Sequence, residues 1–494
     1  MKENVLSACR PELVFRYFED ICAIPHPSGH EEALADYVEA FARRQGLACR
    51  RDEANNVFIR KPATTGHEAA GAVLLQGHMD MVGEKDAESE HDFLTDGLSL
   101  SVEDGWIRAD HTTLGGDDGI AVAMMLALLD QTPEPHPALE CLFSVSEETG
   151  LIGAWAFDPD GMGMTATRMI NLDSEQEGVI TAGCAGGVRT DITLPVGTVP
   201  ARGTAVTVSV AGLAGGHSGA EIHKGHLNGI KLLGQLLLPL VDEYDFRLVS
   251  LSGGGKDNAI PRDGTATLCL PAEQVSGFCA RVAAEAEAIR REPSTVAEDR
   301  DFVCTVTPAG EAAGLMMDSD GTRRVLTLLG LVRNGVLAMS AHVPGLVAFS
   351  RNLGIIRTDY APGGAGAQVS LTFSTRSACE HQLDANQTEL SCLAAALGAT
   401  ATHRARYPGW DYAPVSPVRE VWIRESQRLL GVTPSVEVIH AGLECGILCG
   451  KRPGLDMISV GPDMRDIHTP REQLSVASTA RTYALLEAVV TALS

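Results

Sequence analysis

The sequence of 494 residues lacks any apolar run near the ~18 residues that a membrane-spanning helix requires, and it has no apolar signal core after its first residues. Positive charge is also scarce: 39 lysines and arginines stand against 64 acidic residues, for a formal net charge of −25. The negative electrostatic potential of a chain with this charge repels phosphate backbones and anionic lipids. We therefore predict a soluble, cytoplasmic protein with no nucleic-acid or membrane partner.

Signatures of several other classes are missing as well. The twelve cysteines are scattered and include no C-x-x-C pair, which disfavours a disulfide scaffold, a zinc ribbon and a thioredoxin-like dithiol, and favours reduced thiols. The sequence has no Gly-x-x-x-x-Gly-Lys phosphate loop and no His-Glu-x-x-His helix. Ala220 stands where a nucleophile elbow around Ser218 would need its second glycine, so a serine hydrolase is disfavoured.

The chain is long enough for two or three domains. Helical and strand patterns alternate through residues 1–185 and return in residues 399–494, which is typical of a layered α/β domain. Ser28 and Glu31 have the spacing of a capping box before the first predicted helix. The predicted helices are His30–Gln45, Asp118–Asp130, Val418–Leu430 and Val476–Leu493, and the predicted strands are Asn56–Arg60, Ala72–Leu75, Glu140–Val145, Met169–Leu172, Val179–Ala182, Ser435–Ile439 and Met457–Val460.

Residues 186–398 have a different pattern. Alternating β-branched runs at Ala205–Val210, Phe246–Leu251 and Gln368–Phe373 predict strands, and helices are expected near Asn228–Leu240 and Arg281–Arg291. We therefore predict an inserted α+β domain that divides the α/β domain into two sequence segments.

Histidines and carboxylates follow the ends of the predicted strands, where open α/β sheets bind their ligands. His78 and Asp80 share a face in an extended chain, so the carboxylate can orient the imidazole toward a metal. Asp117 precedes an apolar helix, where it could bridge two cations or serve as a simple helix cap. Glu147 and Glu148 follow a buried strand; one could bind metal while the other holds a water, although a solvated turn would have the same composition.

Two further residues complete this pattern: Asp173 follows another strand, and His468 lies far along the sequence but also just after a strand. Each motif is weak alone, and the argument depends on their joint occurrence. Together they form a mixed nitrogen and oxygen ligand set that suits zinc or a similar divalent ion. The pattern leaves open which member of each acidic pair has which role.

In this order the motifs resemble the M20 family of dinuclear zinc peptidases. The resemblance spans nearly the whole chain and implies a catalytic domain with a mixed sheet flanked by helices, a di-zinc centre and an inserted lid domain that forms a dimer in many relatives. Longer motifs resemble the carnosinase-like, aminoacyl-histidine dipeptidase branch: Ile24-Pro-His-Pro-Ser-Gly-His-Glu-Glu, Gly183-Cys-Ala-Gly-Gly, Gly215-Gly-His217-Ser-Gly, Gly255-Lys-Asp-Asn258-Ala-Ile-Pro-Arg and His440-Ala-Gly-Leu-Glu444-Cys-Gly.

The resemblance also implies roles for the candidate residues. One zinc ion would be held by His78 and Asp173, the other by Glu148 and His468, with Asp117 bridging the two. Asp80 would orient His78, and Glu147 would be the general base. Asp118 stands where relatives of this branch carry asparagine, so cobalt and manganese stay open as alternatives to zinc.

Three candidate substrate ligands lie in the inserted segment and one in the second α/β segment. His217 would stabilise the charge that develops on the carbonyl oxygen, although a histidine in a glycine-rich turn needs no such role. Asn258 and Arg376 are candidates for the terminal carboxylate; for Arg376 a surface salt bridge is the alternative. Glu444 is a candidate for the amino group. If the inserted domain dimerises, a two-fold interface could carry His217 into the active site of the neighbouring subunit.

The sequence thus predicts a homodimeric metallodipeptidase that acts on unblocked dipeptides, with C-terminal histidine as one preference. An N-acyl amino acid deacylase and a tripeptide aminopeptidase are alternatives with the same mechanism, because pocket shape is not visible in a sequence. A catalytically inactive metal-binding scaffold is the alternative from another class. The complete ligand set argues against it, since buried acids are costly without cations.

Overall fold

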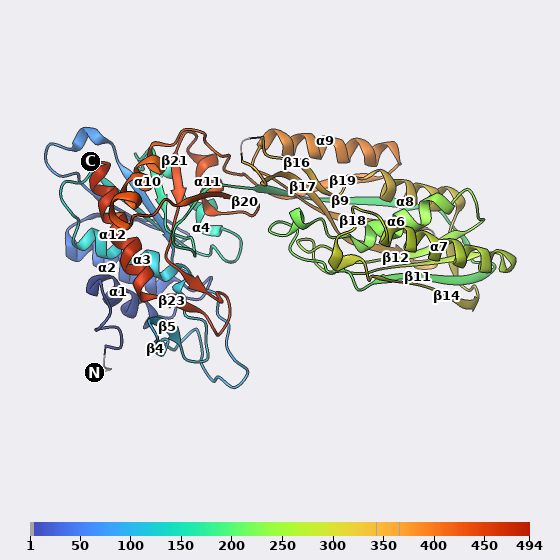
Figure 1. The fold of residues 1–494 in the computed structure, drawn as a ribbon, viewed down its shortest axis with the longest axis horizontal. Coiled ribbons are helices and arrows are strands. Elements are labelled where there is room, and N and C mark those ends of the chain that lie inside the picture. The colour runs from blue at the N-terminus through green and yellow to red at the C-terminus, as the bar shows by residue number, and fades with distance from the viewer. Residues whose placement is uncertain (1–3, 342, 365) are drawn as a thin grey trace. The chain divides into compact units, whose positions relative to one another are not determined.

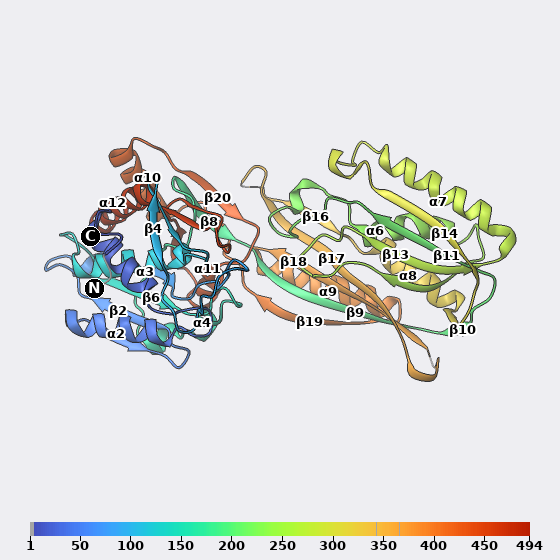
Figure 2. The ribbon, with the colours of Figure 1, turned by 90° about the horizontal axis from the view of Figure 1, so that it is seen from below.

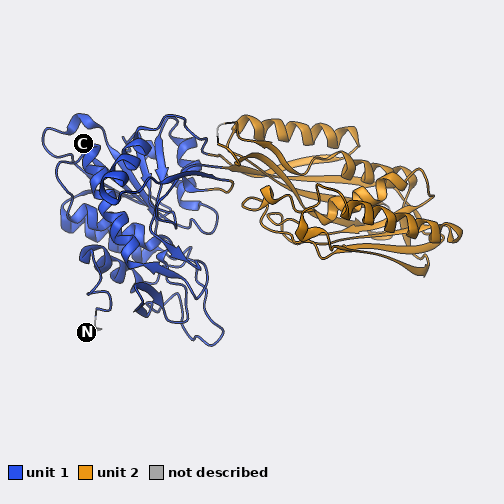
Figure 3. Ribbon diagram, in the orientation of Figure 1, with its two compact units in different colours: residues 1–184, 410–439, 443–494 blue, residues 185–409, 440–442 orange. Residues whose placement is uncertain are grey.

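The computed structural model describes residues 4–341, 343–364 and 366–494, and the chain divides into two compact units (Figure 3). Unit 1 comprises residues 1–184, 410–439 and 443–494, and unit 2 comprises residues 185–409 and 440–442. Among the described residues, no helix is long and apolar enough to cross a membrane.

An eight-stranded mixed sheet forms the centre of unit 1, in the order β1-β2-β6-β3-β7-β21-β8-β20 (Figure 1). Its middle strands β6, β3, β7 and β21 run parallel to one another. The strands of this sheet are β1 (Ala48–Arg51), β2 (Val57–Lys61), β3 (Val73–His78), β6 (Leu139–Ser144), β7 (Arg168–Asn171), β8 (Val179–Cys184), β20 (Ser435–Ile439) and β21 (Asp456–Ser459). The helices of unit 1 are α1 (Glu12–Cys22), α2 (Glu32–Gln45), α3 (Gly116–Asp130), α4 (Ile152–Ala156), α5 (Pro159–Met162), α10 (Pro417–Leu430), α11 (Glu444–Lys451) and α12 (Val476–Ala492).

This sheet is buried on both faces, which explains the nearly continuous apolar runs of its strands. Alternate residues enter different cores: Val73 and Leu75 pack with side chains of α1, α2, α3, α10 and α12, whereas Leu74 packs with side chains of α5 and α11. Helix α3 is apolar all round because it is enclosed in the first of these cores, with Ile120–Leu129 buried throughout.

A smaller sheet of unit 1 has the order β22-β23-β5-β4, with β4 at Leu100–Glu103, β5 at Trp106–Ala109, β22 at Met464–Arg465 and β23 at Gln473–Ser475. Strands β22 and β23 form an antiparallel hairpin in which Arg465 pairs with Gln473. Its loop, residues 466–472, contains His468. The small sheet therefore anchors the segment that carries this predicted ligand.

Unit 2 contains two larger antiparallel sheets, β12-β13-β11-β14 and β16-β17-β18-β9-β19, and the pair β10-β15. Helices α6 and α7 pack on the first sheet, and α8 and α9 pack on the second (Figure 2). The strands are β9 (Gly186–Val196), β10 (Thr198–Pro200), β11 (Thr204–Ala211), β12 (Arg247–Ser252), β13 (Gly264–Leu270), β14 (Val303–Glu311), β15 (Leu315–Met317), β16 (Gly335–Met339), β17 (Val347–Tyr360), β18 (Ala367–Ser377) and β19 (Thr400–Tyr407); the helices are α6 (Gly229–Leu237), α7 (Val275–Arg290), α8 (Ser319–Leu331) and α9 (Glu380–Ala396).

The predicted fold class, a mixed α/β unit interrupted by an α+β unit, is confirmed. The second boundary lies at residue 409 instead of 398. The reason is that β19 follows α9 after a turn at Gly398 and pairs with β9, which keeps residues 400–407 in the five-stranded sheet of unit 2.

The predicted capping box is wrong. Helix α2 begins at Glu32, and the side chain of Glu31 does not cap it. Ser28 instead donates its hydroxyl to Asp80 at 2.8 Å, and Glu31 accepts the backbone N–H of Ser146 at 2.8 Å. Both side chains bind segments far away in the sequence, which local spacing cannot reveal.

Candidate metal centre

Four parallel strands of unit 1 have their carboxyl ends at the same end of the sheet. The register pairs His78 with Ser144 at the ends of β3 and β6, and it pairs Asn171 of β7 with both Gln76 and Ser459. The segments that follow these strands therefore begin side by side, as is usual for ligand sites in α/β sheets. These segments carry predicted site residues: Asp80, Glu147, Glu148, Asp173 and His468.

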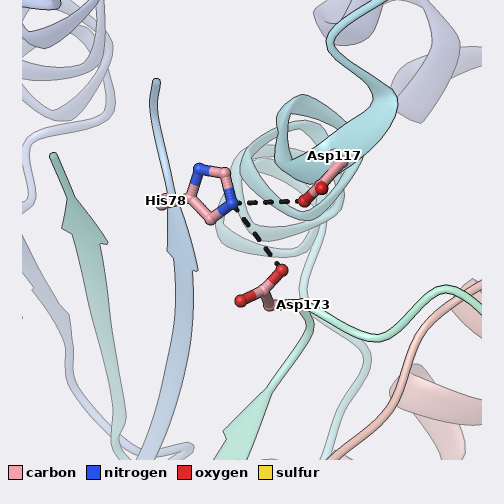
Figure 4. Close-up of side chains that lie close together, drawn as sticks. All are labelled: His78, Asp117 and Asp173. Carbon is pink, nitrogen blue, oxygen red and sulfur yellow. Dashed lines mark hydrogen bonds and ion pairs between the residues drawn. The ribbon is translucent and has the colours of Figure 1, made fainter. Parts of the chain in front are cut away.

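The imidazole of His78 is buried at this edge and has a defined orientation. Its Nδ1 donates to the backbone oxygen of Asp80 at 2.9 Å, so Nε2 is the nitrogen that faces the cluster. This Nε2 lies 3.2 Å from Oδ1 of Asp117 and 3.6 Å from Oδ1 of Asp173, and Figure 4 shows both carboxylates directed toward it. The three side chains offer a nitrogen and carboxylate oxygens within 4.8 Å of one another.

A second group shares Asp117 with the first. Nε2 of His468 lies 2.6 Å from Oε1 of Glu148 and 3.0 Å from Oδ2 of Asp117. The two oxygens of Asp117 thus face different histidines, since Oδ1 faces His78 and Oδ2 faces His468. A carboxylate in this position can serve two adjacent cations.

The carboxylate of Asp80 connects His78 to the loop that follows β6. Its Oδ1 accepts the N–H of Glu147 at 2.9 Å and lies 3.3 Å from Nδ1 of His78. Its Oδ2 accepts the hydroxyl of Ser28 at 2.8 Å and the N–H of Glu148 at 3.3 Å. Asp80 therefore holds the imidazole and the backbone of both glutamates in one network.

The crowded acids shift the pKa values of the cluster. Burial raises the pKa of Glu147 to about 9; the charge of His78 opposes this shift and Asp173 adds to it. Burial likewise raises the pKa of Asp173 to about 7, against the hydrogen bond from His78. Burial favours a high pKa for Asp117 too, but hydrogen bonds from His468 and His78 hold it below its usual range. The bond to Asp117 in turn raises the pKa of His468 to about 10.

This donor set fits two divalent cations. Imidazole nitrogens and carboxylate oxygens are ligands that zinc accepts, and buried carboxylates need compensating positive charge. Within the described ranges, no lysine or arginine forms an ion pair with Asp117, Glu148 or Asp173; their ion-pair partners are His78 and His468. Cations held here would supply the missing charge.

Asp118 has a supporting position beside the cluster. Its Oδ2 accepts the backbone N–H of His78 at 3.2 Å, and its Oδ1 has no hydrogen-bond partner among the described residues. Burial raises the pKa of Asp118 well above its usual value. It belongs to neither of the two groups described above, nor to a third in which His78 lies near Glu147 and Glu148. An asparagine could accept the same bond from the backbone of His78.

Glu444 lies at the start of α11 and is fully buried. Its Oε2 accepts the amide of Gln76 at 2.5 Å and the hydroxyl of Ser144 at 2.7 Å, while its Oε1 has no partner in the described part of the chain. Because Gln76 and Ser144 lie on β3 and β6, Glu444 is fixed next to the strand ends that carry the cluster. Burial raises the pKa of Glu444 to about 7, although His78 opposes the shift.

His217 lies in unit 2, in the glycine-rich segment after β11. Its Nδ1 accepts the N–H groups of Gly219 at 3.3 Å and Ala220 at 3.0 Å, so the proton of a neutral imidazole is on Nε2. Burial and the nearby charge of Arg376 lower the pKa of His217, which favours this neutral form. The side chain is thus a donor at Nε2. Asn258 is adjacent, since its backbone oxygen accepts the N–H of Ser218 at 2.9 Å.

Arg376 packs against the same segment and is only 6% exposed. A β-carbon placed on Gly219 would lie 3.0 Å from Nε of Arg376 and 3.1 Å from Cε1 of His217, with the backbone oxygen of His440 at 2.5 Å. Arg376 donates to the hydroxyl of Tyr407 at 3.1 Å, and its Nε has no hydrogen-bond partner within the described ranges. A surface salt bridge for Arg376 is therefore wrong.

Sequence patterns missed several residues of these networks. Gln76 had a signal, because it is a polar side chain within an otherwise apolar strand. His440 had no signal beyond its motif and Tyr407 had none, because their contacts with the segment around Arg376 arise only in the fold. Glu472, whose carboxylate binds the backbone of Asp117, also gave no local signal.

Comparisons with known proteins show which chains this one resembles in sequence and fold. Residues 208–291 match the family model of the M20 peptidase dimerisation domain. The chain is 37% identical over 484 residues to the cytosol non-specific dipeptidase of Escherichia coli (strain K12), covering 97% of each chain. The crystal structure of aminoacylhistidine dipeptidase from Vibrio alginolyticus matches with a TM-score of 0.92 at 34% identity, covering 99% of this chain and 98% of that one. The aminopeptidase PepT from Bacillus cereus shares the fold, with a TM-score of 0.58 at 17% identity over 98% of this chain and 99% of that one.

Proposed function

The chain belongs to the M20 family of peptidases, and on this basis we propose that it is a cytoplasmic dipeptidase that hydrolyses unblocked dipeptides at a centre of two divalent metal ions. Zinc is the proposed metal, because the ligand set mixes imidazole and carboxylate. We also propose that the protein acts as a homodimer, which the match to a dimerisation domain supports.

The observation that carries this proposal is the free oxygen of Glu444. Oε1 is buried without a donor, while Oε2 is fixed by Gln76 and Ser144. A buried carboxylate oxygen without a partner is costly, and a substrate ammonium would supply the missing donor. An N-acyl substrate carries no such ammonium, so this residue favours a dipeptidase over a deacylase.

Unit 2 offers the complementary charge. Arg376 is buried with Nε unpartnered and with no carboxylate paired to it among the described residues. A guanidinium in this state is suited to a carboxylate ligand. We assign Arg376, with Asn258 nearby, to the terminal carboxylate of the dipeptide. A free carboxylate on the substrate would thus supply the partner that this guanidinium lacks.

The remaining residues account for the chemistry. Two bound divalent cations would polarise the peptide carbonyl and acidify water. The ligands are His78 and Asp173 for one ion, Glu148 and His468 for the other, and Asp117 for both.

Proton transfer and charge stabilisation fall to two further side chains. Glu147 would take the proton of the attacking water on its carboxylate and pass it to the amide nitrogen as the peptide bond breaks. His217 would donate from Nε2 to the carbonyl oxygen as negative charge develops there. Asp80 orients His78 and holds the backbone of Glu147 in place.

A substrate panel tests the proposed function. We expect the purified, metal-loaded protein to cleave unblocked dipeptides, with and without C-terminal histidine, and to leave the N-acetylated forms of the same dipeptides intact. Amino acids released should be measured by chromatography. Cleavage of acetylated amino acids without dipeptide turnover would replace this proposal by a deacylase, and preferential release from tripeptides would replace it by an aminopeptidase.

We propose that His217 serves the active site of the partner subunit. His217 belongs to unit 2, and part of this unit, residues 208–291, matches a peptidase dimerisation domain. A two-fold interface formed by this unit would carry His217 of one subunit to the metal centre of its neighbour.

Mixing two inactive variants tests this assignment. After subunits have been dissociated and reassociated, which mass spectrometry of tagged subunits checks, a mixture of Glu147→Gln and His217→Ala should recover activity. Because His217 serves the partner, each mixed dimer contains one composite site with both groups intact. Random reassortment should therefore restore roughly a quarter of wild-type activity by this symmetry count. Activity that stays at the level of the separate variants after exchange would overturn this assignment.

A further inference from the structure

Glu472 is an acidic side chain whose function the mechanism does not yet explain. It is 3% exposed, and its carboxylate accepts four successive backbone N–H groups. Oε2 accepts from Leu114 at 2.7 Å and from Gly115 at 3.1 Å, and Oε1 accepts from Gly116 at 2.8 Å and from Asp117 at 3.3 Å. All of these residues lie in unit 1, and the four N–H donors lie just before and at the start of α3.

The backbone that Glu472 binds is not held by regular helix geometry. Gly115 has a φ of 66°, in the left-handed region. Asp117 (φ −83°, ψ 102°) and Asp118 (φ −119°, ψ 28°) also depart from helical backbone angles. The first N–H groups of a helix have no acceptor within the helix, and a negative charge at this end is favourable. Glu472 supplies both the acceptors and the charge at the point where Asp117 leaves the backbone.

Glu472 also belongs to the segment that carries His468. Both residues lie in the loop between β22 and β23, and the pairing of Arg465 with Gln473 closes this loop. Strand β23 is in turn paired with β5, since Leu474 lies opposite Ile107. The carboxylate of Glu472 therefore links an anchored hairpin, with one histidine ligand on it, to the backbone of the shared ligand Asp117.

We propose that Glu472 is a positioning residue of the metal centre. By fixing the backbone of Asp117, it sets the carboxylate so that Oδ1 faces His78 and Oδ2 faces His468. Without this contact, the backbone of Asp117 loses its link to the His468 hairpin, and the contact between the side chains of Asp117 and His468 remains. This inference rests on the proposed two-metal function, and it concerns metal affinity rather than a chemical step.

The test is Glu472→Gln, with zinc affinity of the full-length protein as the readout. Glutamine keeps one oxygen, but its amide nitrogen faces two buried N–H donors and leaves them without an acceptor. Residues that support metal ligands typically contribute 10- to 100-fold in metal affinity. We therefore expect the Kd for zinc, measured by competition with a chelator, to rise roughly 10- to 100-fold in this variant. The ion held by Asp117, Glu148 and His468 should be lost first.

Glu140 provides a matched control. It is fully buried at the start of β6, away from the strand end at Ser144. Its carboxylate accepts the N–H groups of Thr165 and Ala166 and also pairs with Arg60 at 3.4 Å. Glu140→Gln therefore removes the same kind of contact without touching the metal ligands. We expect this variant to lower thermal stability and to bind zinc as the wild type does.

The outcomes separate this inference from the function on which it rests. A wild-type protein that binds no zinc would contradict the proposed function itself. Zinc affinity of Glu472→Gln equal to wild type, or an equal loss in Glu140→Gln, would overturn the positioning role. If Glu472→Gln does not fold, Gly116→Ala replaces it, because its new methyl would lie 3.2 Å from Oε1 of Glu472 and displace the carboxylate. A several-fold loss of zinc affinity is then expected, and unchanged affinity would overturn the inference.

Discussion

Replacing Glu147 by glutamine should lower kcat by about 10²- to 10⁴-fold while the protein keeps its metal, because general acid–base catalysis contributes a factor of this size. The backbone N–H of Glu147, which donates to Asp80, is unaffected by the change. Metal-ligand contacts of Asp117, Asp173 and the two histidines do not involve the Glu147 side chain in the proposed assignment. Steady-state kinetics on one dipeptide, together with zinc analysis of the same sample, measures both effects.

The neighbouring glutamate is the control for this assignment. Oε1 of Glu148 lies 2.6 Å from Nε2 of His468, within the group that shares Asp117, so Glu148→Gln should lose zinc as well as activity. The opposite pattern, with zinc lost in Glu147→Gln and retained in Glu148→Gln, would reverse the roles of the pair. Equal metal content with undiminished kcat in Glu147→Gln would remove the general base from the mechanism.

The strand ends that carry the cluster could be predicted from the sequence because two short-range signals coincide there. An apolar run predicts a buried strand, and a polar residue just after it marks where the strand leaves the core. His78 is the last residue of β3 and Glu147 follows β6, and the parallel register brings the ends of both strands together. The pairing of the strands itself had to come from the fold.

Other features depend on contacts between distant segments and left no local signal. Ser28 and Glu31 match a capping box by spacing, yet they bind Asp80 and Ser146, because a buried carboxylate or hydroxyl gains more from these partners than from an exposed helix end. Glu472 was not predicted for the same reason: an acid in a loop looks solvated until the fold places four N–H groups around it.

Removing the metal should abolish activity, and adding zinc, manganese or cobalt should restore it. Among the described residues, the ion-pair partners of the buried carboxylates in the cluster are His78 and His468. None of these side chains can polarise the peptide carbonyl as a bound metal ion would. Dialysis against a chelator, followed by elemental analysis and assay on a dipeptide, measures the loss. Stepwise addition of each metal to the same sample measures the recovery.

Stability provides a second readout that does not depend on turnover. Ions that bind only the folded chain stabilise it by about 4 kcal/mol per site when the free metal is about 1,000 times its Kd. The apoprotein should therefore unfold at a lower temperature than the zinc form, since burial of Asp173 and Glu147 then has no cation to offset it. Full activity in a sample shown to be metal-free would end the two-metal proposal. An unchanged unfolding temperature with activity lost would place the chelator's effect outside this centre.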